Sequence, residues 1–253
     1  MSTIAIGSGK GSPGATFVAT NLAAAMARTS MEVVLLDVDP AGGDVCGYLG
    51  LDPRRGLYPL LRMEALAAGP DRLLAEAEER SGFLAVCGFP EACQLASADT
   101  LVEVIRTANA SGRTVVADIG RISEANASLA READLAVLVV RPDLVSVLGA
   151  ERAVRCLERV GVSTDHPVAV VSGLDRRRPA DRAEVADAVG LPVLGAVPLD
   201  RRGARRALLA QMPATSRRLR HPLDRLAAAV RKALSQTSLA REALAAEPVG
   251  VAT

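Results

Sequence analysis

A glycine-rich loop near the N-terminus carries the residues best suited to bind a phosphate group. The loop runs from Gly7 to Thr16, between an apolar run at 2–6 and a stretch with helical apolar spacing at 16–26. Glycines let backbone N–H groups converge on an anion, and the helix that follows adds its positive N-terminal end. A strand, this loop and a helix therefore predict a phosphate-binding loop, although a glycine-rich loop alone can be an ordinary turn.

The loop fits the pattern G-x-x-x-x-G-K-[ST] at every fixed position except one. Gly9 and Gly14 match the two glycines, and Thr16 matches the residue whose hydroxyl binds Mg²⁺. Ala15 stands where the pattern has a lysine that reaches the phosphates, while Lys10 lies near the start of the loop. Loss of such a charge commonly costs ~10²–10³ in rate. The sequence therefore predicts nucleotide and Mg²⁺ binding with slow or negligible hydrolysis by a monomer.

Three carboxylates follow or end buried strands. Asp37 and Asp39 close the apolar run at 33–39, and Asp118 lies near the end of the run at 114–120. The carboxyl ends of parallel strands meet at one edge of a sheet, where ligands of such folds bind. These acids are therefore candidates to act beside the phosphate site, the alternative being that they only cap strand ends.

The elements that must position these residues are short apolar runs that alternate with helical stretches. Seven runs read as strands buried on both faces: 2–6, 33–39, 83–89, 114–120, 135–142, 167–173 and 192–198. Helical spacing is found at 16–26, 73–80, 98–110, 145–160 and 180–190. This alternation predicts an α/β fold, a doubly wound and mostly parallel sheet with helices on both faces.

Composition excludes several other classes. The chain has 253 residues, 49 % of them hydrophobic, only 2 % aromatic and none Trp. Disorder over the whole chain and aromatic-stacking nucleic-acid readers are therefore excluded. The four Cys are far apart and lack CxxC spacing, so we expect small buried side chains in a reducing compartment. With no long apolar run and no signal peptide, the sequence predicts a cytoplasmic protein: one P-loop ATPase-like domain over 1–235 and a mobile, Ala-rich helix or tail over 236–253.

The loop resembles the deviant Walker A motif, K-G-G-x-G-K-[ST], of the ParA/MinD family of P-loop ATPases. LLDVDP at 35–40 resembles the family's switch I, VVADIG at 115–120 its Walker B strand, and GAVPLD at 195–200 the segment that closes over the base. Ser172 stands where the family often has an Asn on the adenine. The resemblance implies ATP and Mg²⁺ as ligands, and a lysine that reaches across a dimer to the partner's nucleotide.

Site residues carried over by this resemblance fall into three groups. Lys10 and Asp39 are the expected catalytic residues, and Thr16, Asp37 and Asp118 the expected metal-binding residues. The expected nucleotide-binding residues are Gly9, Lys10, Gly11, Ser12, Pro13, Gly14, Ala15, Thr16, Phe17, Pro198 and Asp200. A fold that has lost nucleotide binding is the alternative, because the main phosphate lysine is missing.

Within the family, the chain resembles the CpaE/TadZ branch of Tad-pilus assembly proteins over roughly residues 2–215. The similarity lies in KGSPGATFVATNLA, in the stretch at 37–62, and in RPDLVSVLGA and VGLPVLGAVPLDRRGARRAL. It implies an ATP-dependent dimeric switch that positions a pilus or secretion machine at a cell pole, with at most weak ATPase activity and with protein partners from that machine. Ser12 and Pro13 replace Gly-Val in the loop, and the receiver-like domain that many of these proteins carry is not seen.

A basic segment at 201–235 keeps a second function open. It holds nine Arg and one Lys against Asp224, a sum of about +9 in a chain whose net charge is +1. Such a charge can bind DNA phosphates, contact anionic lipid peripherally, or form a solvated face. The alternative function is therefore an active ParA-type partitioning ATPase that binds DNA non-specifically. Leu223, Leu226, Val230 and Leu234 form one apolar stripe, which predicts packing on the domain.

Overall fold

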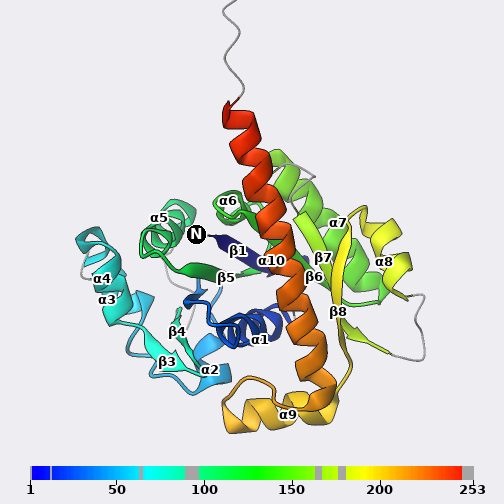
Figure 1. The fold of residues 1–253 in the computed structure, drawn as a ribbon, viewed down its shortest axis with the longest axis horizontal. Coiled ribbons are helices and arrows are strands. Elements are labelled where there is room, and N and C mark those ends of the chain that lie inside the picture. Colours follow the sequence, from blue (N-terminus) through cyan, green and yellow to red (C-terminus); the bar gives the residue numbers. More distant parts are fainter. Residues whose placement is uncertain are drawn as a thin grey trace, which may run out of the picture.

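The computed structural model describes residues 2–11, 13–62, 65–88, 97–162, 167–175 and 181–246, and Figure 1 shows them as one open sheet with helices on both faces. The strands are β1 (Thr3–Ser8), β2 (Val33–Asp37), β3 (Glu78–Arg80), β4 (Phe83–Val86), β5 (Thr114–Arg121), β6 (Leu135–Val140), β7 (Pro167–Leu174) and β8 (Val193–Pro198). The helices are α1 (Ala15–Ala27), α2 (Val45–Leu49), α3 (Leu57–Arg62), α4 (Pro70–Ala75), α5 (Ala98–Asn109), α6 (Ser128–Arg131), α7 (Leu144–Arg159), α8 (Asp181–Val189), α9 (Arg201–Ala210) and α10 (Arg217–Ala246), with a 3-10 turn η1 (Ala65–Ala68).

The sheet has eight strands in the order β3-β4-β2-β5-β1-β6-β7-β8. All neighbouring strands in it pair in parallel except β3 with β4. The predicted doubly wound, mostly parallel sheet is confirmed. β1 lies in the middle, between β5 and β6, so the loop after β1 opens at the carboxyl edge where the strand order reverses.

The helix predicted at 73–80 is wrong. α4 ends at Ala75, and Glu78–Arg80 forms the edge strand β3, antiparallel to β4. The backbone of β4 offers an unpaired edge there, so hydrogen bonding to β4 outweighs the weak helical pattern of a Glu-rich stretch. The other predicted helical stretches correspond to α1, α5, α7 and α8.

Two apolar layers hold the sheet, one on each face. Ile4 and Ile6 of β1 belong to the layer with α1 and α10, whereas Ala5 belongs to the layer with α5, α6, α7 and α8. Strands covered on both faces need apolar residues at every position, which is why the pattern in sequence is continuous rather than alternating. All six residues of β1 are buried.

The long helix α10 crosses one face of the sheet (Figure 1). Leu223, Leu226, Val230 and Leu234 are each at most 6 % exposed, so the predicted packing of this stripe on the domain is confirmed. α10 continues past residue 235 to Ala246, and the division of the chain at 235 stays a prediction. In the part of the chain that the structure describes, no helix is both long and apolar enough to cross a membrane.

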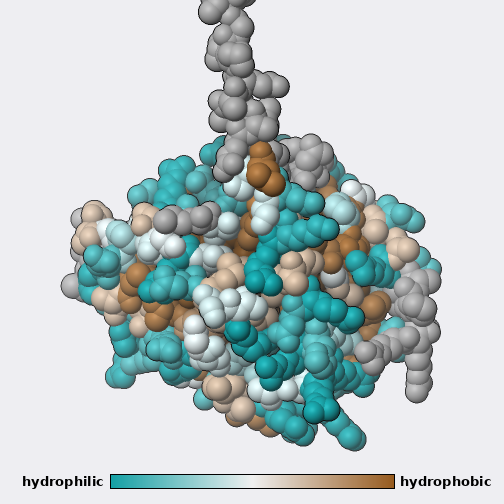
Figure 2. Space-filling view, in the orientation of Figure 1, coloured by the Kyte–Doolittle hydropathy of each residue, from teal (hydrophilic) through white to brown (hydrophobic). Residues whose placement is uncertain are grey.

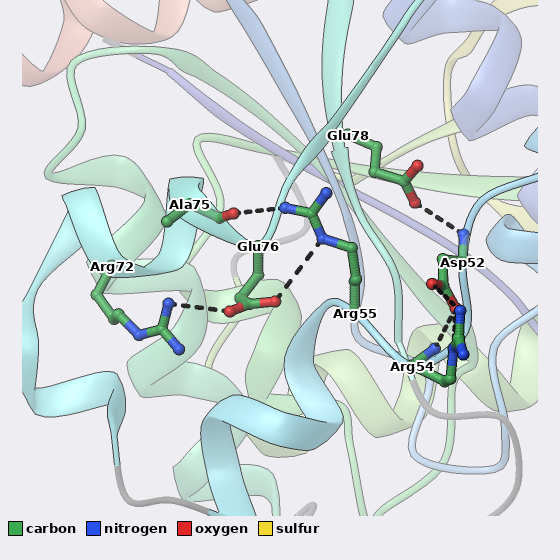
Figure 3. A network of polar contacts seen from close by, with 7 residues as sticks. All are labelled: Asp52, Arg54, Arg55, Arg72, Ala75, Glu76 and Glu78. Carbon is green, nitrogen blue, oxygen red and sulfur yellow. Dashed lines mark hydrogen bonds and ion pairs between the residues drawn. The ribbon is translucent and has the colours of Figure 1, made fainter.

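A polar network joins the segment after α2 to β3 and α4 (Figure 3). Glu78 accepts a hydrogen bond of 2.8 Å from the Asp52 amide, and Arg55 donates one of 2.7 Å to the Ala75 carbonyl. Arg80 donates to the carbonyls of Leu49 and Gly50 at the end of α2. The network fixes α2, and α2 begins directly after the loop that carries Asp39 and follows Asp37 at the end of β2.

Candidate functional site

The loop after β1 packs tightly against α7. A Cβ atom on Gly9 would lie 2.1 Å from the backbone carbonyl of Gly149, and one on Gly149 would lie 2.9 Å from the Gly9 oxygen. The Ser8 hydroxyl donates a hydrogen bond of 2.9 Å to the Lys10 carbonyl. Since a glycine inside a helix costs stability, its place in the middle of α7 is explained by this contact. Gly149 is a site-forming residue that sequence reasoning missed.

Gly14 closes the loop and starts α1. Its φ of 97° is in the left-handed region, which favours glycine, and Ala15 is the first residue of the helix. No side chain of α1 caps its first amides, and Gly14 is the residue before the helix. Free N–H groups at a helix N-terminus attract an anion. Ala15 is 7 % exposed and brings no charge to this point.

The three candidate acids come together at the carboxyl edge of the sheet. Asp37 and Asp118 are directly paired in the register of β2 with β5, and each is 1 % exposed. Asp39 lies against Gly120, where a Cβ atom would be 2.1 Å from its carboxylate. The Thr16 side chain acts on the Asp118 carboxylate and lowers its pKa, which links the acids to the start of α1.

Burial makes these carboxylates hard to ionise. Desolvation, and then the charge of Asp118, raise the pKa of Asp37 well above its ordinary value. Burial raises the pKa of Asp118 to about 6 and also raises that of Asp39. Backbone amides partly offset this effect: the Val45 amide donates to Asp37 over 3.1 Å, and the Ala41 amide to Asp39 over 2.9 Å. Negative charges held this close favour a bound cation.

The donor set fits Mg²⁺ bound together with a phosphate ligand. Among the described residues, no group of three or more His, Cys, Asp or Glu side chains forms a metal site of its own. Mg²⁺ usually keeps several waters and takes one or two carboxylates plus substrate phosphates. The Thr16 hydroxyl and the Asp118 carboxylate, with Asp37 behind them, offer that kind of incomplete shell.

The Lys10 side chain reaches the start of α7. Its ammonium nitrogen lies 3.9 Å from the Asp143 carboxylate, and the side chain is 31 % exposed. Asp143 caps α7 by accepting a hydrogen bond of 2.9 Å from the Ser146 amide, and its other oxygen lies 3.6 Å from Arg141. Three large apolar side chains surround this point on α7: Leu144, Val145 and Leu148, with exposures of 73, 59 and 45 %.

A cavity of about 210 Å³ opens beside the loop, between α1 and the end of β8. The expected nucleotide-binding residues that line it are Pro13, Gly14, Phe17, Pro198 and Asp200. Tyr48, Arg141, Ser172 and Gly173 also line it. The rings of Phe17 and Tyr48 suit a base or ribose better than a phosphate.

Sequence reasoning missed Arg141 and Tyr48, since neither follows a recognisable motif.

Asp200 also caps α9 by accepting a hydrogen bond of 2.9 Å from the Gly203 amide and one of 3.0 Å from the Ser216 hydroxyl. These bonds lower the pKa of Asp200, so it is a carboxylate at neutral pH.

The structure brings Lys10, Thr16, Asp37, Asp39 and Asp118 to one edge of the sheet, whereas Ser12 lies outside the described residues. The roles expected for these residues stay predictions.

Comparisons with known proteins agree with this arrangement. The model of the ParA family, described as NUBPL iron-transfer P-loop NTPase, matches residues 1–65. An uncharacterised ATP-binding protein of Methanocaldococcus jannaschii is 28 % identical over 201 residues, which is 78 % of this chain and 74 % of that protein.

Solved structures extend the similarity to nearly the whole chain. A ParA family ATPase from Chlorobium tepidum superposes with a TM-score of 0.77 at 18 % identity, over 90 % of this chain and 98 % of that one. The chain has the fold of the ParA/MinD P-loop NTPases. The septum site-determining protein MinD from Pyrococcus horikoshii, complexed with Mg-ADP, has a TM-score of 0.75 at 20 % identity, over 93 % of this chain and 98 % of that one. The partial family match and the sequence relative agree with this fold.

Proposed function

We propose that this chain is a nucleotide-dependent dimeric switch that binds ATP with Mg²⁺ and positions a cellular machine, a Tad-type pilus assembly. The single observation that carries the proposal is the position of Lys10, which lies at an exposed apolar face beside the loop while Ala15 leaves the loop's usual lysine position uncharged. A lysine so placed serves a second protomer better than its own site. The names of the similar proteins, an ATP-binding protein and a septum site-determining protein with Mg-ADP, support both ATP and a positioning role.

Each part of the site has a task in this proposal. The glycine-rich loop and the N-terminus of α1 hold the phosphates, and the cavity beside Phe17 holds the base. When bound, Mg²⁺ neutralises charge on the phosphates. Asp39 orients a water molecule, and Thr16, Asp37 and Asp118 hold the metal. Hydrolysis is weak because Ala15 contributes no positive charge to the transition state.

The exposed apolar residues of α7 support a second copy of the chain as the partner in the ATP state. Leu144, Val145 and Leu148 form a patch beside Lys10, and patches of this kind mark protein interfaces. In the organism that carries this chain, we expect a fluorescent fusion of the protein to form a focus at a cell pole. The Lys10→Ala variant should lose this focus, and cells that carry it should lose their surface pili. A dispersed wild-type protein with normal pili would refute the pilus role and leave ATP binding to be judged separately.

An active partitioning ATPase is the second candidate, because α9 carries unpaired positive charge. Arg201, Arg202, Arg205 and Arg206 are exposed and form no ion pair with any described residue. Binding to DNA through them would fall steeply with salt. The test is fluorescence anisotropy with a random-sequence duplex from 50 to 200 mM salt. ATP-dependent binding lost in an Arg202→Glu/Arg206→Glu variant supports this second function, and no binding at 50 mM salt excludes it.

A further inference from the structure

A second cavity, of about 390 Å³, lies along the edge strand β8 between α8 and α10. It is larger than the 210 Å³ cavity beside the glycine-rich loop and within the size range of small-molecule sites. Most of its wall is apolar: Leu174, Leu194, Gly195, Ala196, Pro198, Pro222 and Leu226. Figure 2 shows hydrophobic atoms in the strip between α10 and α8, with hydrophilic atoms on both sides.

The floor of this cavity depends on a glycine. A Cβ atom on Gly195 would lie 2.8 Å from the Leu226 side chain, so Leu226 packs directly on the strand. Leu226 is 2 % exposed, whereas Leu194 and Ala196 are only half-buried because β8 has no strand on its other side. The edge is nevertheless poorly suited to an added peptide strand, since its register with β7 is interrupted twice and Pro198 has no N–H.

Two guanidinium groups from different helices stand at the rim. Arg182 of α8 donates a hydrogen bond of 2.7 Å to the Val193 carbonyl, which holds it over the cavity. Arg225 of α10 has no ion pair with any described residue, because the neighbouring Asp224 is paired with Arg28 and Arg220. Within the described part of the chain, neither Arg182 nor Arg225 forms an ion pair, so both bring positive charge to the rim.

Among the described residues that line the cavity, two arginines are the only side chains that can form hydrogen bonds, and this lining favours one kind of ligand. Guanidinium groups bind carboxylate and phosphate oxygens in a planar, two-point geometry. The apolar side chains of the walls can pack against a hydrocarbon chain, but they do not form the hydrogen bonds that a sugar or a base requires. We propose that this cavity binds an amphipathic anion, a single aliphatic chain that carries a carboxylate or phosphate head.

The cavity is linked to the candidate nucleotide site through the ends of β7 and β8. Pro198 lines both cavities, and Leu174 directly follows Ser172 and Gly173, which line the nucleotide cavity. The Leu199 amide donates a hydrogen bond of 2.9 Å to the Leu174 carbonyl and fixes the two strand ends together. We expect a ligand beside Leu174 and Pro198 to change nucleotide affinity, and linkage then requires nucleotide to change ligand affinity to the same degree. This coupling rests on the proposed function, whereas binding of the anion does not.

The test uses two ligands with the same tail, decanoate and decanol, titrated calorimetrically into the full chain below their micelle or solubility limits. We expect 1:1 binding of decanoate, with decanol at least about tenfold weaker because it lacks the charge that the guanidinium groups bind. Decyl phosphate distinguishes the two possible head groups. Whichever of decanoate and decyl phosphate binds more tightly identifies the head group of the natural ligand. The proposal is overturned if decanol binds as tightly as the two anions, or if decanoate, decyl phosphate and decanol all fail to bind.

Variants locate the site. Arg225→Gln should weaken decanoate binding about fivefold or more, whereas Arg231→Gln, on an exposed position of the same helix away from the cavity, should leave it unchanged. Ala196→Phe fills the cavity and should abolish binding. If the Arg225→Gln and Arg231→Gln proteins bind decanoate with the same affinity, the assigned site is refuted. This comparison stands even if Ala196→Phe fails to fold. Decanoate titrations with and without Mg-ATP measure the coupling between the two cavities. If the protein binds decanoate but not ATP, the proposed function is refuted and the proposed anion site stands.

Discussion

The Lys10 ammonium lies 3.9 Å from the same Asp143 oxygen that caps α7 through the Ser146 amide. One carboxylate therefore both starts the helix and holds the lysine within its own protomer. The two side chains are 31 and 45 % exposed, and ion pairs this exposed typically contribute only about 0–1 kcal/mol. The lysine can thus leave Asp143 for a partner's nucleotide at little cost.

Asp143→Asn should strengthen the ATP-dependent dimer by up to about fivefold, because it releases Lys10 from the pair. Asn is as good a helix cap as Asp, so α7 keeps its start. Sedimentation equilibrium over a concentration series with Mg-ATP measures the dimer dissociation constant. The gain should vanish when Lys10→Ala is added. A weaker dimer in the single variant would mean that Asp143 itself binds the partner.

Ala15→Lys should raise ATP turnover about tenfold to a hundredfold, because it restores a positive charge where the transferred phosphoryl group gains charge. Ala15→Met is the matched control, since its side chain is long but uncharged. A phosphate-release assay at saturating Mg-ATP compares the three proteins. If the Lys and Met variants turn over ATP at the same rate as the parent, slow hydrolysis has another cause than Ala15.

Gly9→Ala should destabilise the fold by about 1–3 kcal/mol and weaken nucleotide binding, because its Cβ atom would overlap the Gly149 backbone. Gly47→Ala is the matched control, at a glycine with free space around it. A Cβ atom on Gly47 would have no atom within 4 Å, and Gly47 lies inside α2. It should stabilise the protein by about 0.5–1 kcal/mol. Urea unfolding gives both values, and a neutral Gly9→Ala would show that the loop is not held by α7.

The loop and the acids could be predicted because their signals are local. A short run such as VVLLD is typical of a strand buried on both faces, and its last residue then lies at the ligand edge. β3 was missed because Glu-Glu-Arg has no apolar pattern and forms a strand only through the backbone of β4. Gly149 and Arg141 were missed because they reach the site from more than a hundred residues away. The only signal for Gly149 is a glycine inside a helical stretch.

Stability without nucleotide should fall as pH rises from about 4 toward 7. The pKa of Asp118 is about 6 in the fold and near its ordinary value of 3.8 when unfolded, so the folded state binds more protons over this range. Unfolding free energy then decreases with pH. Asp118→Asn should reduce this slope, to which Asp37 and Asp39 also contribute, and should stabilise the protein at pH 7.5 by at least about 1 kcal/mol. Denaturation at several pH values measures the slope; a parent protein whose stability rises between pH 5 and 7 would contradict the raised pKa values of these buried acids.

The mass of the chain in solution tests the central claim most directly. Light scattering would be measured without nucleotide, with Mg-ADP and with Mg-ATP, for the parent, Lys10→Ala and the exposed-surface control Lys232→Ala. The account predicts a dimer for the parent and the Lys232 variant with Mg-ATP, and a monomer for Lys10→Ala under every condition. A mass that ignores nucleotide, or a Lys10→Ala protein that dimerises like its parent, would contradict an ATP-dependent switch held by Lys10.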